Sequence, residues 1–251
     1  TNPGGKAMRN IRIIAKREIV GYFITPLAYI FIVIFLALIG AFAFYIGRFF
    51  TNGQASLESF FAYHPWLYLI LVPAVAMRLW AEERKSGTIE LLMTLPVSRG
   101  AMVLGKFLAA WVFVGIALLL TFPMVLTVNY LGNPDNGAII TGYIGSWLLA
   151  GGYLAIGSCM SALTKNQVIA FIVSVVACFV FIVSGVSMVQ NLFSGWAPQW
   201  VLDTIASFSF LIRFDAISKG VLDLRDLLYF FSLMAVWLFA TAIVIDLKKA
   251  D

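Results

Sequence analysis

Long runs of apolar residues are the feature that most constrains this chain. A helix needs about 20 mostly apolar residues to cross a bilayer, and six stretches of this kind follow one another along the sequence. Of all residues, 62% are hydrophobic and 12% are charged, whereas soluble domains carry roughly 25% charged residues. The six runs are Leu27–Ile46, Phe60–Met77, Phe107–Tyr130, Tyr143–Leu163, Val168–Val189 and Leu227–Ile245. We therefore predict an all-α membrane protein with six transmembrane helices.

The chain is predicted to form one membrane domain with short flanking segments. Residues 1–7 (TNPGGKA) look like a tag or a trimmed extension, and residues 8–25 look like an amphipathic helix. Residues 26–247 would form the six-helix domain, and residues 248–251 a short tail. Small residues such as Gly151 in the fourth run permit close helix packing, either within the chain or between chains.

Basic residues are distributed unevenly between the two sides of the predicted bundle. An even number of spans places both termini on one side. That side holds every Lys and Arg except Arg48, Arg213, Lys219 and Arg225, whereas the acidic residues divide equally. Loops rich in Lys and Arg stay in the cytoplasm, so we expect both termini to be cytoplasmic. The net charge of +5 then needs no nucleic-acid partner to explain it.

The segment before the first run has the pattern of an amphipathic helix. Basic side chains form one stripe and apolar ones lie broadly opposite. A helix of this kind lies in the headgroup layer of a membrane. It is either an electrostatic anchor on the bilayer or an elbow helix that also touches a cytoplasmic partner. The basic residues are Arg9, Arg12, Lys16 and Arg17, and the apolar ones are Ile11, Ile14, Ala15 and Tyr22.

A short apolar helix framed by charges is predicted within Glu82–Arg99, which reads EERKSGTIELLMTLPVSR. Gly87 would break the preceding helix, Thr88 is a suitable N-cap, and Pro96 would end the new helix. The helix is too short to span a membrane and too apolar for a solvated loop. It either docks into a groove of another protein or packs on its own bundle as a re-entrant or interfacial turn.

The segment from residue 190 to residue 226 is predicted to lie on the outer side. Trp196, Pro198 and Trp200 mark an interfacial start, and the apolar stretch that follows ends near Gly220. This segment forms either re-entrant helices or a lid over the outer mouth of the bundle.

The runs lack the residues that membrane chemistry requires. Ion-coupled transporters and proton pumps need ionisable residues at depth, and His64 near the outer interface reads as a surface residue. Cys159 and Cys178 lie in apolar runs and read as small buried side chains. Gly100–Lys106 has the spacing of a phosphate-binding loop, but Phe107 stands where Ser or Thr would bind magnesium. We therefore expect no enzyme activity, no metal site and no bound cofactor in this chain.

Two motifs resemble a known family. The pattern E-x(3)-GT-x-E-LL-x-T-x-P-x-S-R in Glu82–Arg99 resembles the cytoplasmic loop of type-2 ABC exporter permeases. Phe208–Leu233 is similar to a run before the last span of the gliding-motility-associated branch of that family. The resemblance implies ATPase-coupling roles for Glu82, Glu83, Gly87, Thr88, Glu90, Leu91, Leu92, Thr94 and Pro96. In the external segment it singles out Phe214, Gly220, Asp223, Arg225 and Asp226.

The resemblance also implies partners and a location. A permease of this family pairs with a second permease chain, identical or homologous, and with cytoplasmic ABC ATPase subunits that bind ATP and magnesium. A membrane protein with a periplasmic domain is a further partner in the gliding-type branch. The chain would then support export or extraction of a substrate across the bacterial inner membrane. The alternative is a subunit that passes ATP-driven motion to a periplasmic partner and moves no substrate.

Overall fold

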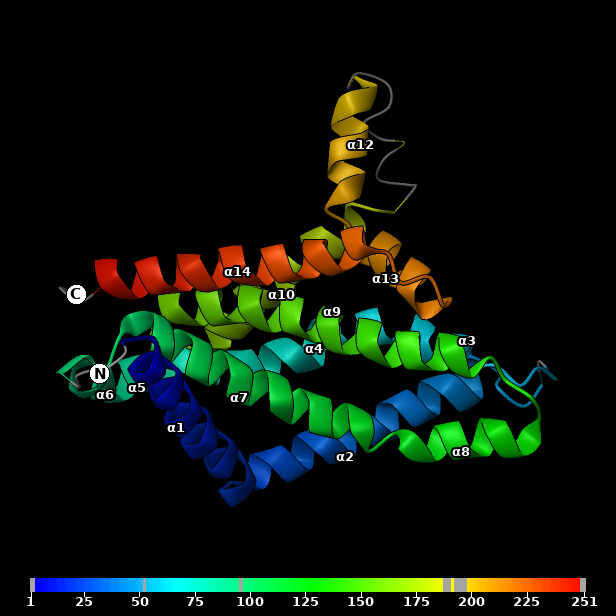
Figure 1. Ribbon diagram of the computed structural model, residues 1–251, viewed down its shortest axis with the longest axis horizontal. Helices are drawn as coiled ribbons and strands as arrows, with labels where there is room; N and C mark the ends of the chain where they lie inside the picture. The colour runs from blue at the N-terminus through cyan, green and yellow to red at the C-terminus, as the bar shows by residue number, and fades with distance from the viewer. Residues whose placement is uncertain (1–2, 52, 95–96, 187–190, 192–197, 249–251) are drawn as a thin grey trace.

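The computed structural model describes residues 3–51, 53–94, 97–186, 191 and 198–248, and within these residues it contains helices and no strands. Long helices lie side by side along one axis, and shorter ones cover their ends (Figure 1). The helices are α1 (Pro3–Ile24), α2 (Pro26–Ala41), the π-helical η1 (Phe42–Ile46), α3 (Glu58–Ala62), α4 (His64–Ala76), α5 (Arg78–Ser86), α6 (Thr88–Thr94), α7 (Arg99–Leu119), α8 (Phe122–Leu131), α9 (Asn136–Leu163), α10 (Gln167–Val183), α12 (Gln199–Ser207), α13 (Phe210–Ser218) and α14 (Leu224–Leu247).

Four helical stretches of the described chain are long and apolar enough to cross a membrane. They are Pro26–Ile46, Arg99–Leu131, Asn136–Leu163 and Leu224–Leu247. The second and fifth predicted spans correspond to shorter helices, because α4 has 13 residues and α10 has 17. The helical membrane class is thus confirmed, whereas the count of six spans stays a prediction.

Two helix boundaries differ in detail from the sequence prediction. The first helix begins at Pro3, five residues before the predicted start of the amphipathic helix at Met8. The third run is divided between α7 and α8 at Leu120 and Thr121, and Pro123 lies in the first turn of α8. Proline is tolerated there because the first turn of a helix needs no N–H donor.

His64 is the clearest error of the sequence interpretation. It is completely buried, and its Nδ1 lies 3.0 Å from the carbonyl oxygen of Phe60. The rings of Phe35, Phe60 and Tyr68 pack against the imidazole. The prediction that His64 is a surface residue was therefore wrong. His64 lies near the start of the second apolar run and packs in the core as an aromatic side chain.

Helix α9 is the centre of the bundle and contacts α4, α5, α7, α10, α13 and α14. Its glycines permit this close packing. A Cβ atom on Gly157 would lie 2.4 Å from the Cβ of Ala76, and one on Gly151 would lie 2.6 Å from the Sδ of Met234. Such distances are shorter than any real Cβ contact, so these glycines serve packing within the chain.

Two tryptophans join α7 to α9 in a reciprocal arrangement. Trp111 Nε1 donates to the carbonyl oxygen of Trp147 at 2.8 Å, and Trp147 Nε1 donates to that of Trp111 at 3.1 Å. Their rings stack with centroids 4.1 Å apart. Both indole donors are satisfied inside the bundle, which matters because a bilayer offers no hydrogen-bond partner.

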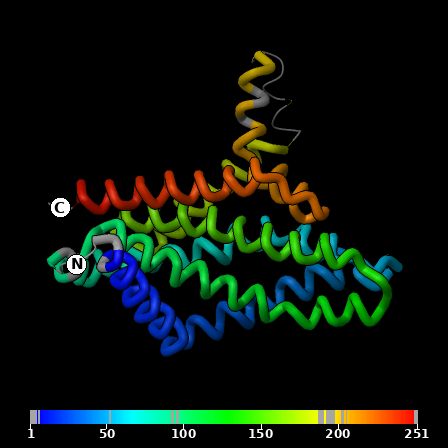
Figure 2. The backbone as a smooth tube through the Cα atoms, viewed as in Figure 1, coloured from blue at the N-terminus to red at the C-terminus, as the bar shows by residue number. Residues whose placement is uncertain are grey.

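The two ends of the bundle differ in what they carry. The start of α1 and the end of α14 lie at the same end, together with α5 and α6 (Figures 1 and 2). We call this the basic end, because Arg84, Arg99, Lys106 and Lys248 come together there. Helices α3 and α13 lie toward the opposite end, and α12 projects away from the bundle (Figure 1).

The close approach of α4 and α9 predicts a specific loss of stability. Gly157→Ala adds one methyl group where Ala76 leaves no space, so we expect a loss of about 1–3 kcal/mol and a lower melting temperature in detergent. Gly40→Ala is the matched control, because nothing lies within 4 Å of the Cβ position on Gly40. Equal melting temperatures for the two variants would contradict the packing described here.

Candidate functional site

Helix α6 is a short exposed helix at the basic end. Helix α5 stops at Gly87, which adopts a φ of 73° and turns the chain sharply into α6. A left-handed residue of this kind is the usual end of a helix. Glu90 and Thr94 are exposed, and Leu91 exposes 68% of its surface. The predicted short helix is therefore present, and it presents an apolar and an acidic side chain outward.

The other residues predicted for this segment have different outcomes in the structure. Thr88 was expected to cap α6. Instead its hydroxyl lies 2.9 Å from the Ser86 hydroxyl, so Thr88 closes the corner with the preceding helix. Ile89 is half-buried against the core. The side chain of Leu92 and the whole of Pro96 lie outside the described residues.

A serine of α9 holds the start of α5. Helix α4 ends at Ala76 and α5 begins at Arg78, and a new helix leaves its first N–H groups without partners in that helix. The Oγ of Ser161 accepts from the N–H of Trp80 at 3.1 Å and from that of Ala81 at 3.0 Å. Its own hydroxyl donates to the carbonyl oxygen of Met77 at 2.8 Å. The break between α4 and α5 is thus closed by a side chain from another helix.

Two further hydrogen bonds fix α5 along α9. Trp80 Nε1 donates to Ser158 Oγ at 3.0 Å, and Arg84 Nη1 donates to the carbonyl oxygen of Ala162 at 2.6 Å. Lys248, which directly follows α14, donates to the carbonyl oxygen of Leu163, the residue after Ala162 in α9. Cationic side chains near the C-terminus of a helix satisfy its last carbonyl groups and complement its dipole. Helix α5 is therefore attached rigidly to the central helix.

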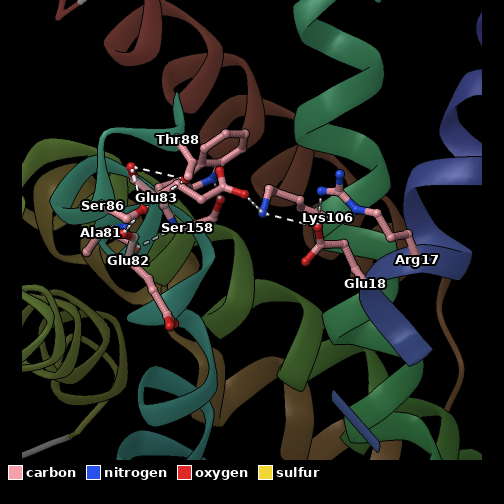
Figure 3. A network of polar contacts seen from close by, with 11 residues as sticks. Arg17, Glu18, Ala81, Glu82, Glu83, Ser86, Thr88, Lys106 and Ser158 are labelled. Atoms are coloured by element: carbon pink, nitrogen blue, oxygen red, sulfur yellow. Dashed lines mark hydrogen bonds and ion pairs between the residues drawn. The ribbon is translucent and has the colours of Figure 1, made fainter. Parts of the chain in front are cut away.

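Lys106 joins three helices through its ammonium group (Figure 3). Its Nζ lies 2.7 Å from a carboxylate oxygen of Glu83 in α5 and 3.4 Å from one of Glu18 in α1. The same Nζ lies 5.3 Å from the centroid of the Trp80 ring. The side chain of Lys106 itself exposes 5% of its surface. The ion-pair cluster of Glu18, Glu83 and Lys106 thus ties α1 and α5 to α7.

The two carboxylates of this cluster are affected differently by their surroundings. Burial raises the pKa of Glu83, and the charge of Lys106 offsets this in part. Burial also acts on Glu18, but the charges of Lys106 and Arg17 prevail and lower its pKa. Since the pKa of Glu18 is lower in the fold, it stabilises the protein above its unfolded pKa, and this stabilisation is lost as pH falls.

Helix α1 has the two faces expected from its sequence. Arg9, Arg12, Lys16 and Arg17 are exposed, whereas Ile14 packs against Gly105 of α7. Near the end of the helix, the ring of Tyr22 stacks on that of Phe113 with centroids 5.1 Å apart. The apolar face of α1 thus lies on the bundle and its basic face remains outside.

The residues singled out between Phe208 and Leu233 take structural positions. Phe214 is buried, and Asp226 forms an ion pair of 2.9 Å with Arg213 across the α13–α14 corner. Gly220 has a φ of 94° in the turn between these helices. Asp223 caps α14 by accepting from the N–H of Arg225 at 3.0 Å. Sequence reasoning missed Arg213, because nothing in the sequence identifies the partner of a buried aspartate.

The described residues provide no metal site, since no three His, Cys, Asp or Glu side chains among them are grouped suitably. Cys159 and Cys178 are both free and buried, as predicted. Of the residues that the sequence predicted for coupling, those from Glu82 to Thr94 lie together on α5 and α6, and Glu83 points into the bundle to Lys106.

The four long apolar helical stretches of the described chain are those of a multi-pass α-helical membrane protein. A family model described as ABC-2 family transporter protein matches residues 12–247 of the chain. The chain therefore belongs to the ABC-2 transporter family and is a membrane subunit of an ABC transporter. No curated protein matches this chain.

Removal of the central cation should destabilise the basic end. Lys106→Met leaves the half-buried carboxylate of Glu83 without its partner, whereas Glu18 keeps its ion pair with Arg17, and a broken buried ion pair costs about 3–5 kcal/mol. We expect a clear fall in the melting temperature of the purified protein. Arg99→Met is the control, because the pair of Arg99 with Asp246 is largely exposed and such pairs contribute little.

The double variant Lys106→Met/Glu83→Gln tests the cause. It removes the charge that Lys106→Met leaves unpaired on α5, so it should recover part of the lost stability. If the double variant is no more stable than Lys106→Met, the ion pair with Glu83 is not the source of the loss.

Proposed function

We propose that this chain is the permease subunit that couples ATP hydrolysis by a separate cytoplasmic ABC ATPase to export or extraction of a substrate across the bacterial inner membrane. The observation that carries this proposal is the exposed helix α6 on a rigidly attached α5. Force applied to α6 would pass through Gly87 into α5. From there it would reach α9 through Ser158 and Ser161, and α1 and α7 through Lys106.

Helix α6 is proposed as the coupling helix. Leu91 would enter a groove of the ATPase, and the exposed carboxylates of Glu82 and Glu90 would pair with basic residues at its rim. Since Glu83 is already paired with Lys106 inside this chain, its role is to hold α5 and not to bind the ATPase. The exposed basic face of α1 would lie on anionic lipid headgroups.

The partners follow from this arrangement. Two permease chains, identical or homologous, would assemble with two ATPase subunits, and ATP and magnesium would bind to those subunits. The bundle would move because the ATPase contacts α6 differently in its ATP-bound and free states, since a shift of conformation requires such a difference. The similarity of Phe208–Leu233 to the gliding-motility-associated branch supports placing the chain there, with a periplasmic-domain membrane protein as a further partner.

A mechanotransmitting subunit is the second candidate. Helix α12 projects away from the bundle beside α13 (Figure 2), and its Trp200 exposes 69% of its surface. A projecting helix with an exposed tryptophan suits contact with a large external protein. In that case, motion from α6 would be passed along α9 to the α13–α14 corner, and no substrate would cross the membrane.

The proposed orientation predicts which cysteine variants react from each side. Leu91→Cys on α6 should react with a membrane-impermeant maleimide in inverted membrane vesicles and not in intact spheroplasts. Val221→Cys at the opposite end, where Val221 exposes 59% of its surface, should show the reverse pattern. The unmodified chain is the control, because both native cysteines are buried. Labelling of Leu91→Cys in spheroplasts would refute a cytoplasmic α6.

The coupling role predicts loss of the ATPase from variants of α6. We would tag the chain in its native host, extract it gently and quantify co-purifying ATPase subunits by mass spectrometry. Glu90→Lys should lower ATPase recovery at least about tenfold, which corresponds to 1.4 kcal/mol. Gly87→Pro should act similarly, because proline cannot adopt the positive φ of Gly87.

The control for these variants is Glu58→Lys, which makes the same charge reversal on α3 at the opposite end of the bundle. It should leave ATPase recovery unchanged, and all variants should still insert into the membrane. If no ABC ATPase co-purifies with the unmodified chain in several detergents or after cross-linking in native membranes, the proposed function fails.

A further inference from the structure

A cavity of about 510 Å³ lies between α1, α2, α4, α5 and α7, beside the ion-pair cluster. Its volume falls within the range of about 300–1,000 Å³ that ligand sites occupy. Neither the coupling role of α6 nor the packing of α9 uses this space. The cavity therefore requires an explanation of its own.

The walls of the cavity are mostly apolar. Helix α2 contributes Ile30 and Ile34, and α4 contributes Leu71 and Val75. Ile30 and Ile34 remain 52% and 43% exposed, so they line one open side. Walls of this kind fit a hydrocarbon chain and give no hydrogen bonds to a polar solute.

One end of the cavity is charged. Arg17 of α1 and Arg78 at the start of α5 both line it. The Nε of Arg78 is buried and has no hydrogen-bond partner, and no ion pair to Arg78 occurs among the described residues. Glu82 also lines this end, one turn along α5, but it lies beyond ion-pair distance. A buried guanidinium donor without an acceptor is costly, so this end is suited to a ligand that supplies one.

The neighbouring carboxylates do not supply the acceptor that Arg78 lacks. Glu18 is occupied by Arg17, at 2.7 Å, and by Lys106. The cavity thus combines an unpaired guanidinium at its charged end with aliphatic walls beyond it. A phosphate group bound to Arg78 would accept charge-assisted hydrogen bonds, and an acyl chain attached to that phosphate would lie along α2 and α4.

We propose that this cavity is a binding site for an anionic phospholipid, taken from the leaflet at the basic end. The phosphate binds Arg78, with Arg17 nearby, and one acyl chain fills the groove between Ile30, Ile34, Leu71 and Val75. Basic pockets between membrane helices recognise anionic headgroups in this way. Because the lipid contacts α1, α2, α4 and α5 together, it holds the first helix against the segment that carries α6. The site is formed within one chain and is independent of the ATPase.

The test is a lipid titration of the purified, delipidated chain in detergent, followed by native mass spectrometry. Phosphatidylglycerol should bind at least about tenfold more tightly than phosphatidylcholine of the same acyl chains, since both carry the phosphate but the choline cation of phosphatidylcholine would be repelled by Arg17 and Arg78. Arg78→Gln should reduce this preference, because it removes a phosphate contact from both lipids but also removes a repulsion from the choline cation of phosphatidylcholine. Lys16→Gln is the matched control, because Lys16 is exposed on α1 and does not line the cavity.

A second pair of variants tests the acyl chain. Ile34→Ser should weaken the binding of both lipids several-fold, whereas Val33→Ser should not, because Val33 faces away from the cavity lining. Arg78 has no partner in the described chain, so its replacement should leave the melting temperature unchanged, and lost binding will not reflect unfolding.

Three results would overturn the proposal. Equal binding of the two lipids, with no effect of Arg78→Gln, would mean that no headgroup site exists. Displacement of the lipid by millimolar inorganic phosphate would identify an anion site without an acyl chain. Cross-linking of Ile34→Cys to a second copy of the chain, with loss of lipid binding on dimer formation, would show that the other permease chain covers the cavity.

Discussion

The arrangement of the basic end depends on the hydroxyl group of Ser161. This hydroxyl satisfies the backbone groups that are left free where the helix is interrupted between α4 and α5. In a bilayer, no water is available to satisfy backbone groups that a helix leaves free. The chain stops one helix at Ala76 and starts another at Arg78, and Ser161 accepts two N–H groups and donates to Met77 at this junction. The direction of α5, and hence the position of α6, is set by this contact with α9.

The ion-pair cluster adds a second constraint to the same helix. Ser161 holds the start of α5 against α9, and Lys106 holds its middle against α7 and α1 through Glu83 and Glu18. A buried ion pair contributes little net stability, but a buried charge that loses its partner is strongly destabilising. The helices that carry the charges are therefore restricted to positions in which the pairs form. The cluster therefore makes the position of α5 specific, and the proposed transmission of motion from α6 requires such a fixed position.

The all-helical membrane class and part of the candidate site at α5 and α6 could be predicted from the sequence. Apolar runs of spanning length need helices in a bilayer, so the all-helical fold could be read directly, as could the short helix between Gly87 and Pro96. The basic face of α1 followed from helical spacing. The number of spans could not be predicted as simply, because α4 and α10 are shorter than their apolar runs. Helix ends depend on local interruptions of the helix, which hydropathy does not detect.

What the sequence by itself determined is therefore the set of properties that one helix can express alone: its apolar length, its polar face and its breaks at glycine and proline. What the tertiary structure decided is every pairing between helices. Ser161 with Trp80, Lys106 with Glu83, Arg213 with Asp226 and His64 among its aromatic rings are each distant in sequence or unmarked by any pattern. Periodicity identifies which face of a helix is apolar, but the partner of a buried polar group is known only once the helices are packed.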